Sequence, residues 1–105
     1  MPYIKQELRS YLDENIDELV ATIANLSQTE GESAIAGLLN YTITSLLESY
    51  SILDGKWNYS RINSVVGILE CVKQEFYGRL ATRYEQQKAR ESGDIGIYKR
   101  FLEKQ

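Results

Sequence analysis

The sequence predicts an all-α fold, and three observations lead to that prediction. Apolar residues recur every three or four positions in several stretches, which is typical of amphipathic helices. Glycine, serine and aspartate stand between those stretches, where helices are expected to end or begin. The 105 residues are 43% hydrophobic and 26% charged, as in an ordinary soluble globular protein. We therefore expect one helical domain over residues 1–105.

The first quarter of the chain predicts two helices. A short amphipathic helix follows Pro2, with Ile4, Leu8 and Leu12 on its apolar side. Asp13 is then expected to cap a second helix that reaches Leu26. The polar stretch 27–33, which contains one glycine, predicts a loop.

Two longer helices follow, at about residues 33–50 and 60–91. The Asp54-Gly55 pair predicts a turn within residues 51–59, and Ser60 is the expected cap of the second helix. Residues 92–94, Ser-Gly-Asp, are expected to end it. Three alternatives stay open for the tail 95–105: a helical turn, a β extension or a docking arm. The apolar seam of the second helix consists of Ile62, Val65, Val66, Leu69, Val72, Phe76 and Leu80.

The length of the second helix predicts that it needs a partner. At about 1.5 Å per residue it is roughly 45 Å long, whereas a chain of this size has a radius of gyration of about 13 Å. We therefore expect it to pair with the helix at 33–50 as an antiparallel hairpin, and the protein to form a homo-oligomer.

Charge is spread unevenly along the chain, although the net charge is only −3. Residues 1–54 contain two basic and nine acidic residues, a net charge of −7. Residues 61–90 contain six basic and three acidic residues, a net charge of +3. The two regions are expected to attract each other within or between chains; the alternative is that the basic helix offers small anions a pocket.

The composition excludes several kinds of chemistry. The chain has no histidine, so the usual general base and histidine-activated nucleophiles are absent. Cys71 is the one cysteine, which excludes a structural zinc site and an intrachain disulfide. The sequence also lacks phosphate-binding and calcium-binding loop motifs. We predict no catalytic residues, no metal site and no cofactor, with a carboxylate-only active site left as the remaining enzymatic alternative.

The expected location is the cytoplasm. The single cysteine, the absence of an apolar leader segment and the absence of an 18-residue apolar run all favour it. The pI of about 5.0 argues against nucleic-acid binding.

A polar stripe follows the seam of the 60–91 helix. On a helical wheel it comprises Glu70, Lys73, Tyr77, Tyr84 and Lys88, while Arg61 and Arg79 share the opposite flank. Three interpretations stay open. The stripe is a wet rim with Glu70–Lys73 and Glu85–Lys88 ion pairs, a subunit interface rich in tyrosine, or a pocket for a small ligand.

Four segments give the chain a family resemblance. They are MPYIKQELR, LNYTITSLL, INSVVGILECVKQEFYGRL and RYEQQKARESGD, and together they cover about two thirds of the chain. They resemble a family of small uncharacterised phage and bacterial proteins, for which no residue roles are known. Some phage proteins of this size are helical oligomers that sequester nucleotide messengers of bacterial immunity, and the resemblance suggests such a role, in the host cytoplasm, by analogy.

The leading functional hypothesis is therefore a non-enzymatic homo-oligomer that sequesters a small anionic, nucleotide-like ligand at a subunit interface. Phosphates would be held by Arg61, Lys73, Arg79 or Lys88, stacking would come from Tyr77 or Tyr84, and hydrogen bonds from Asn40 or Glu70. The alternative is a protein-binding adaptor or inhibitor that acts through Tyr41, Trp57, Tyr59 and the acidic first half.

Overall fold

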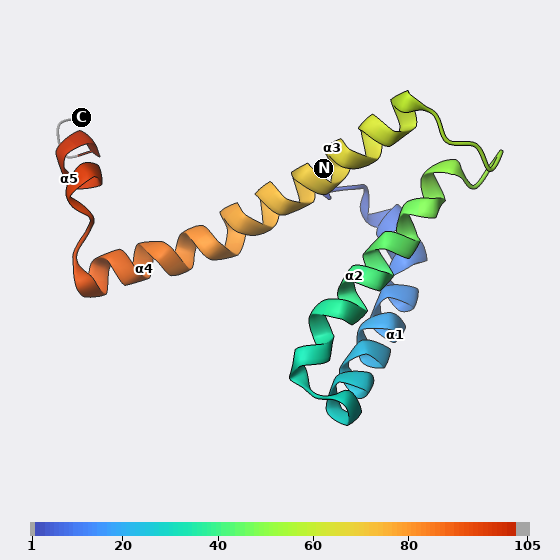
Figure 1. Ribbon diagram of the computed structural model, residues 1–105, viewed down its shortest axis with the longest axis horizontal. Helices are drawn as coiled ribbons and strands as arrows, with labels where there is room; N and C mark the ends of the chain where they lie inside the picture. Colours follow the sequence, from blue (N-terminus) through green and yellow to red (C-terminus); the bar gives the residue numbers. More distant parts are fainter. Residues whose placement is uncertain (1, 103–105) are drawn as a thin grey trace. The chain divides into compact units, whose positions relative to one another are not determined.

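The computed structural model describes residues 2–102, and within that range it contains helices and no strand (Figure 1). The predicted all-α class is confirmed. The backbone forms two compact units, Met1–Gly67 and Ile68–Gln105. No helix in the described part of the chain combines the length and the apolar character that crossing a membrane would require.

Helix α1, Gln6–Glu30, is a single helix, so the predicted division at Asp13 and the loop at 27–33 are wrong. Asp13 lies inside the helix, and no glycine or proline interrupts it before Gly31. The polar residues near its end bond back into the helix: the Ser27 hydroxyl donates to the carbonyl of Ile23 at 2.7 Å. Gly31 ends it with a φ of +95°, a backbone region that glycine alone adopts readily.

Helix α2, Ile35–Leu46, is flanked by 3-10 turns at Glu32–Ala34 and Leu47–Ser51, which confirms the predicted helix at 33–50. It lies antiparallel beside α1 (Figure 1). The sequence predicted that α2 pairs with the helix that begins at Tyr59. Among the described residues of the first unit, the backbone of α2 does not pack against that helix; α2 packs against α1 instead. Periodicity marks an apolar side on each helix, but does not say which sides meet.

An ion-paired turn connects the 3-10 turn at Leu47–Ser51 to the next helix, as predicted for residues 51–59. The Arg61 guanidinium donates to both Asp54 carboxylate oxygens, at 2.6 and 3.0 Å, and to the carbonyl of Lys56. The cap of the next helix is Asn58 rather than Ser60, because the Asn58 side chain accepts the amide N–H of Arg61 at 2.9 Å.

We expect acid to loosen this turn. The hydrogen bond from Arg61 lowers the pKa of the Asp54 carboxyl below its ordinary 3.8. A depressed pKa contributes stability that is present above pH 3.8 and is lost as the pH falls through the folded-state value. NMR titration should therefore place the pKa of Asp54 below 3.8 in the native protein and raise it towards the ordinary value in Arg61→Ala, where the hydrogen bond from the backbone N–H of Lys56 remains. Lys56→Ala is the control and should leave it unchanged, because Lys56 contributes only backbone groups.

The long predicted helix is present but contains a π turn. Helix α3, Tyr59–Phe76, is followed by the π turn Tyr77–Ala81 and by helix α4, Thr82–Ser92. Gly93, with a φ of +84°, ends α4 at the predicted position. A further helix, α5, spans Gly96–Leu102, which selects the helical alternative for the tail; residues 103–105 lie outside the described part of the chain.

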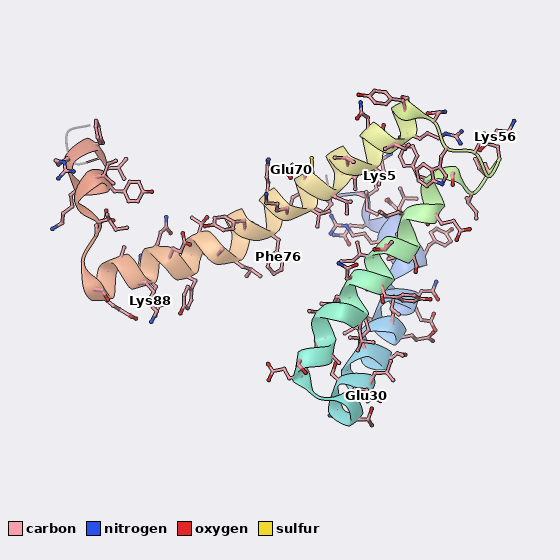
Figure 2. All side chains as sticks on the ribbon, viewed as in Figure 1. Lys5, Glu30, Lys56, Glu70, Phe76 and Lys88 are labelled. Carbon is pink, nitrogen blue, oxygen red and sulfur yellow. The ribbon has the colours of Figure 1, made fainter. Side chains whose placement is uncertain are left out.

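Most apolar side chains are exposed in the single chain (Figure 2). Within residues 2–102, Val65 is the one buried hydrophobic residue, and α1, α2 and α4 bury none. Val65 belongs to the predicted seam, but the other seam positions are exposed, with Leu69 at 38% and Phe76 at 65%. The described residues therefore form many helical turns but bury very little apolar surface between them.

Candidate functional site

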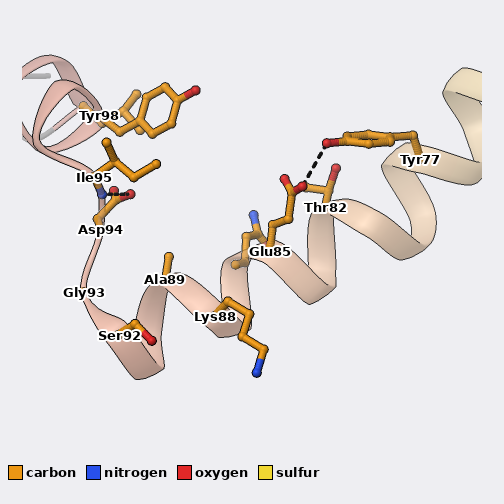
Figure 3. A pocket seen from close by; sticks show the side chains of 12 residues that line it. Tyr77, Thr82, Glu85, Lys88, Ala89, Ser92, Gly93, Asp94, Ile95 and Tyr98 are labelled. Atoms are coloured by element: carbon orange, nitrogen blue, oxygen red, sulfur yellow. Dashed lines mark hydrogen bonds between the residues drawn. The ribbon is translucent and has the colours of Figure 1, made fainter.

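The π turn divides the predicted stripe in two. A π turn takes up one residue more than an α-helical turn, so residues beyond it are displaced by about one position, or roughly 100° around the axis. Glu70, Lys73 and Tyr77 precede or begin the turn, whereas Tyr84 and Lys88 follow it. Figure 3 shows the result for two members of the stripe: the side chains of Tyr77 and Lys88 leave the helix in different directions.

The charged members of the stripe have local partners. The Lys73 ammonium lies 3.6 Å from the Glu70 carboxylate, which is the predicted pair. Lys88 does not pair with Glu85 as predicted. Its ammonium lies 3.5 Å from Glu91 and 5.5 Å from the centre of the Tyr84 ring.

The remaining predicted residues lie elsewhere. Arg61 closes the turn at Asp54 in the first unit. Asn40 lies on α2, where its side-chain oxygen accepts the Thr44 hydroxyl at 3.4 Å and where it lines a shallow hollow. Arg79 lies in the π turn and makes no ion pair among the described residues. Of the eight predicted ligand-binding residues, Tyr77 and Lys88 line one hollow together.

That hollow, the α4–α5 hollow, lies in the second unit at the corner where Gly93 ends α4 (Figure 3). Its volume is about 750 Å³. The lining positions on α4 recur at helical spacing and form one side of that helix, and those that follow Gly93 recur in the same way. The lining residues are Tyr77, Thr82, Glu85, Gln86, Lys88, Ala89, Ser92, Gly93, Asp94, Ile95, Tyr98 and Leu102.

The π turn brings Tyr77 and Glu85 together. In a straight α-helix, residues eight apart are about 80° apart around the axis; with one residue taken up by a π turn, they are about 20° apart. The Tyr77 hydroxyl accordingly donates to the Glu85 carboxylate at 3.0 Å (Figure 3). This hydrogen bond, with the nearby Glu85 charge, raises the pKa of the Tyr77 phenol above its ordinary 10.0. Tyr77 therefore stays a hydrogen-bond donor well into alkaline pH.

We expect the ionisation of Tyr77 to report on this contact. A raised pKa contributes stability that is complete below pH 10.0 and is lost as the pH rises through the folded-state value. Glu85→Gln should lower the pKa of Tyr77 towards 10.0, because glutamine keeps the acceptor oxygen but removes the charge. NMR of ring-labelled tyrosine measures it. Glu91→Gln should leave the titration unchanged, and an equal shift in both variants would contradict the specific contact.

Sequence reasoning missed Glu85, Asp94 and Tyr98 as members of one site. The signal was available in part: positions 82, 85, 89 and 92 have helical spacing, as do 95, 98 and 102, with a glycine between the two sets. The spacing does not reveal the π turn, and it is the π turn that places Tyr77 on the same side of the helix as Glu85.

Comparison with known proteins gives one match. No curated protein matches the chain, and no solved structure does. A family model, described as a domain of unknown function (DUF6899), matches residues 1–95, so the match covers α1 to α4 and stops before Tyr98 and Leu102. This agrees with the expected uncharacterised family, while its phage origin stays a prediction. Because the match spans nine tenths of its length, the chain belongs to the DUF6899 family.

Proposed function

We propose that the protein is a non-catalytic binding protein that assembles as a homo-oligomer and acts as an adaptor or inhibitor of another protein. The observation behind this proposal is the exposure of the apolar sides of its helices. Leu12 and Ile16 on α1 are each 50% exposed, and Val72 on α3 is 58% exposed. Full burial of an exposed side chain of this kind contributes about 1.5–3 kcal/mol, so covering a half-exposed one contributes about half as much. A chain that leaves many of them in water has a large free-energy reason to associate.

Charge complementarity favours a second copy of the chain as the cover for these sides. The first 54 residues have a net charge of −7, and residues 61–90 a net charge of +3. An acidic helix pair from one subunit and a basic helix from the next would attract each other before their apolar sides meet. Two acidic helix pairs would repel each other.

The surface proposed for the other protein lies on the first unit. Tyr41 is 76% exposed and Tyr59 is 79% exposed, and Trp57 adds a third aromatic side chain. Tyr41 lines the hollow on α2 together with Ala36, Gly37 and Ser45. Exposed aromatic residues are suited to protein contacts, and the net charge of −7 over residues 1–54 favours a basic partner surface.

Native mass spectrometry followed by affinity capture tests both parts of the proposal. We expect a discrete oligomer, and a partner protein that is captured by the wild type but lost in the double variant Tyr41→Ala, Tyr59→Ala. Tyr11→Ala is the matched control, since Tyr11 is an equally exposed tyrosine of the same unit, and it should keep the partner. A monomer would refute the assembly, and a partner that survives the double substitution would refute the surface.

Sequestration of a small anionic ligand is the second candidate, favoured by Arg79. This guanidinium lies in a π turn, a feature frequent at functional sites, and has no acidic partner among the described residues. Native spectra of the protein as purified would then show an added small-molecule mass on the oligomer, and Arg79→Ala would remove it. An oligomer without added mass favours the adaptor.

A further inference from the structure

The α4–α5 hollow has an acidic character that neither proposed function uses. Glu85 lines it from α4, and Asp94 lines it from the segment between α4 and α5. Glu85 accepts a hydrogen bond from the hydroxyl of Tyr77. One carboxylate oxygen of Asp94 accepts the amide N–H of Ile95 at 2.8 Å, and its other oxygen has no hydrogen-bond partner within the described part of the chain. Both carboxylates keep further acceptor capacity, because each has about four lone-pair sites.

Lys88, the one basic residue that lines the hollow within residues 2–102, does not neutralise it. The Lys88 ammonium pairs with Glu91 at 3.5 Å and lies over the ring of Tyr84. In the close view its side chain points away from Tyr98 and Ile95 (Figure 3). Among the described residues, a phosphate placed here would meet two carboxylates and no available cation, so the hollow disfavours the anionic ligand that the sequence suggested.

The other lining groups favour an organic cation. The rings of Tyr77 and Tyr98 approach from the two ends of the hollow, with their hydroxyls directed towards each other (Figure 3). Each hydroxyl oxygen can accept a hydrogen bond from an ammonium group. Ala89, Ile95 and Leu102 add apolar surface that a hydrocarbon stem would cover. The volume of about 750 Å³ lies within the range of small-molecule sites.

We propose that the α4–α5 hollow binds a small organic cation, an ammonium group on an apolar body. Glu85 and Asp94 pair with the charge, Tyr77 and Tyr98 contact the ammonium and the body, and Ile95 and Leu102 cover its apolar end. This site goes beyond the adaptor proposal and does not depend on it, because all its residues lie in one unit of one chain.

The test uses two probes of the same shape, phenethylamine and 2-phenylethanol, titrated into the isotopically labelled full-length protein at neutral pH. We expect phenethylamine to cause saturable NMR shifts at residues 82–98 and the neutral alcohol to bind roughly tenfold more weakly. Glu85→Gln and Asp94→Asn should each weaken phenethylamine binding by roughly tenfold. Both variants keep the acceptor oxygens that Tyr77 and Ile95 use, so the corner should keep its fold.

Glu70→Gln is the control, because it removes one negative charge from the same unit outside the hollow. It should bind phenethylamine like the wild type. Equal binding of the two probes, or equal weakening in all three variants, would overturn the proposal. So would the absence of saturable shifts at residues 82–98.

Discussion

Aspartates in place of Leu69 and Phe76 should convert the protein from an oligomer to a monomer. Both side chains lie on the apolar seam of α3 and are exposed in the single chain. Full burial of an exposed leucine or phenylalanine side chain contributes about 1.5–3 kcal/mol. Because Leu69 is 38% exposed and Phe76 is 65% exposed, losing both should weaken association by about 1.5–3 kcal/mol. That corresponds to a dissociation constant roughly 10 to 10² times higher. Light scattering on a size-exclusion column, over a range of protein concentrations, measures the change.

Cys71→Asp is the matched control for this pair. Cys71 is exposed on the same helix, and the helical wheel places it almost opposite Ile62 and the seam of α3. It introduces the same new charge without removing an apolar seam contact, so it should leave the subunit number unchanged. An oligomer that survives both seam aspartates would show that another side of the helix, or another helix, forms the interface.

Replacing Gly31 by alanine should destabilise the protein by about 1–3 kcal/mol. Gly31 has φ +95° and ψ 158°, a conformation that is strained for any residue with a Cβ atom. Space is not the cause, because a Cβ atom built on Gly31 meets nothing within 4 Å. The strain falls on the connection that lets α2 return beside α1, so the cost should appear in global unfolding by urea, measured at a fixed protein concentration.

Gly67→Ala is the same substitution in the opposite setting. Gly67 lies inside α3 without a positive φ, and an added Cβ atom again meets nothing within 4 Å. Alanine should therefore stabilise the helix by about 0.5–1 kcal/mol. Opposite signs at Gly31 and Gly67 would confirm that backbone conformation decides the effect; a neutral Gly31→Ala would contradict it.

The helices were predictable where spacing and stop signals agree. The seam of the 60–91 helix and the glycine at 93 placed that helix within one residue at each end. The N-terminal helix was misread because Asp13 is compatible with both a cap and a helix interior, and because the Ser27 and Thr29 hydroxyls donate to carbonyls of the same helix. The partner of α2 depends on which apolar sides meet, a tertiary choice that no local pattern encodes.

The candidate site was predictable in part, for the same kind of reason. Tyrosine and lysine near an apolar seam pointed to Tyr77 and Lys88, both of which line the α4–α5 hollow. The hydrogen bond between Tyr77 and Glu85 depends on the π turn, and a helical wheel drawn for a regular α-helix does not represent that turn. Asp94 and Tyr98 could not be placed, because the sequence did not decide whether the tail that begins at residue 95 is helical.

The π turn also limits how α3 and α4 can be covered. Side-chain ridges on one helix fit the grooves of another only while both keep a constant phase. Here the phase before Phe76 and the phase after Thr82 differ by roughly one residue position. A single straight helix that fits the first stretch is out of step on the second. Covering both stretches therefore requires two separate segments, or one segment with a matching irregularity.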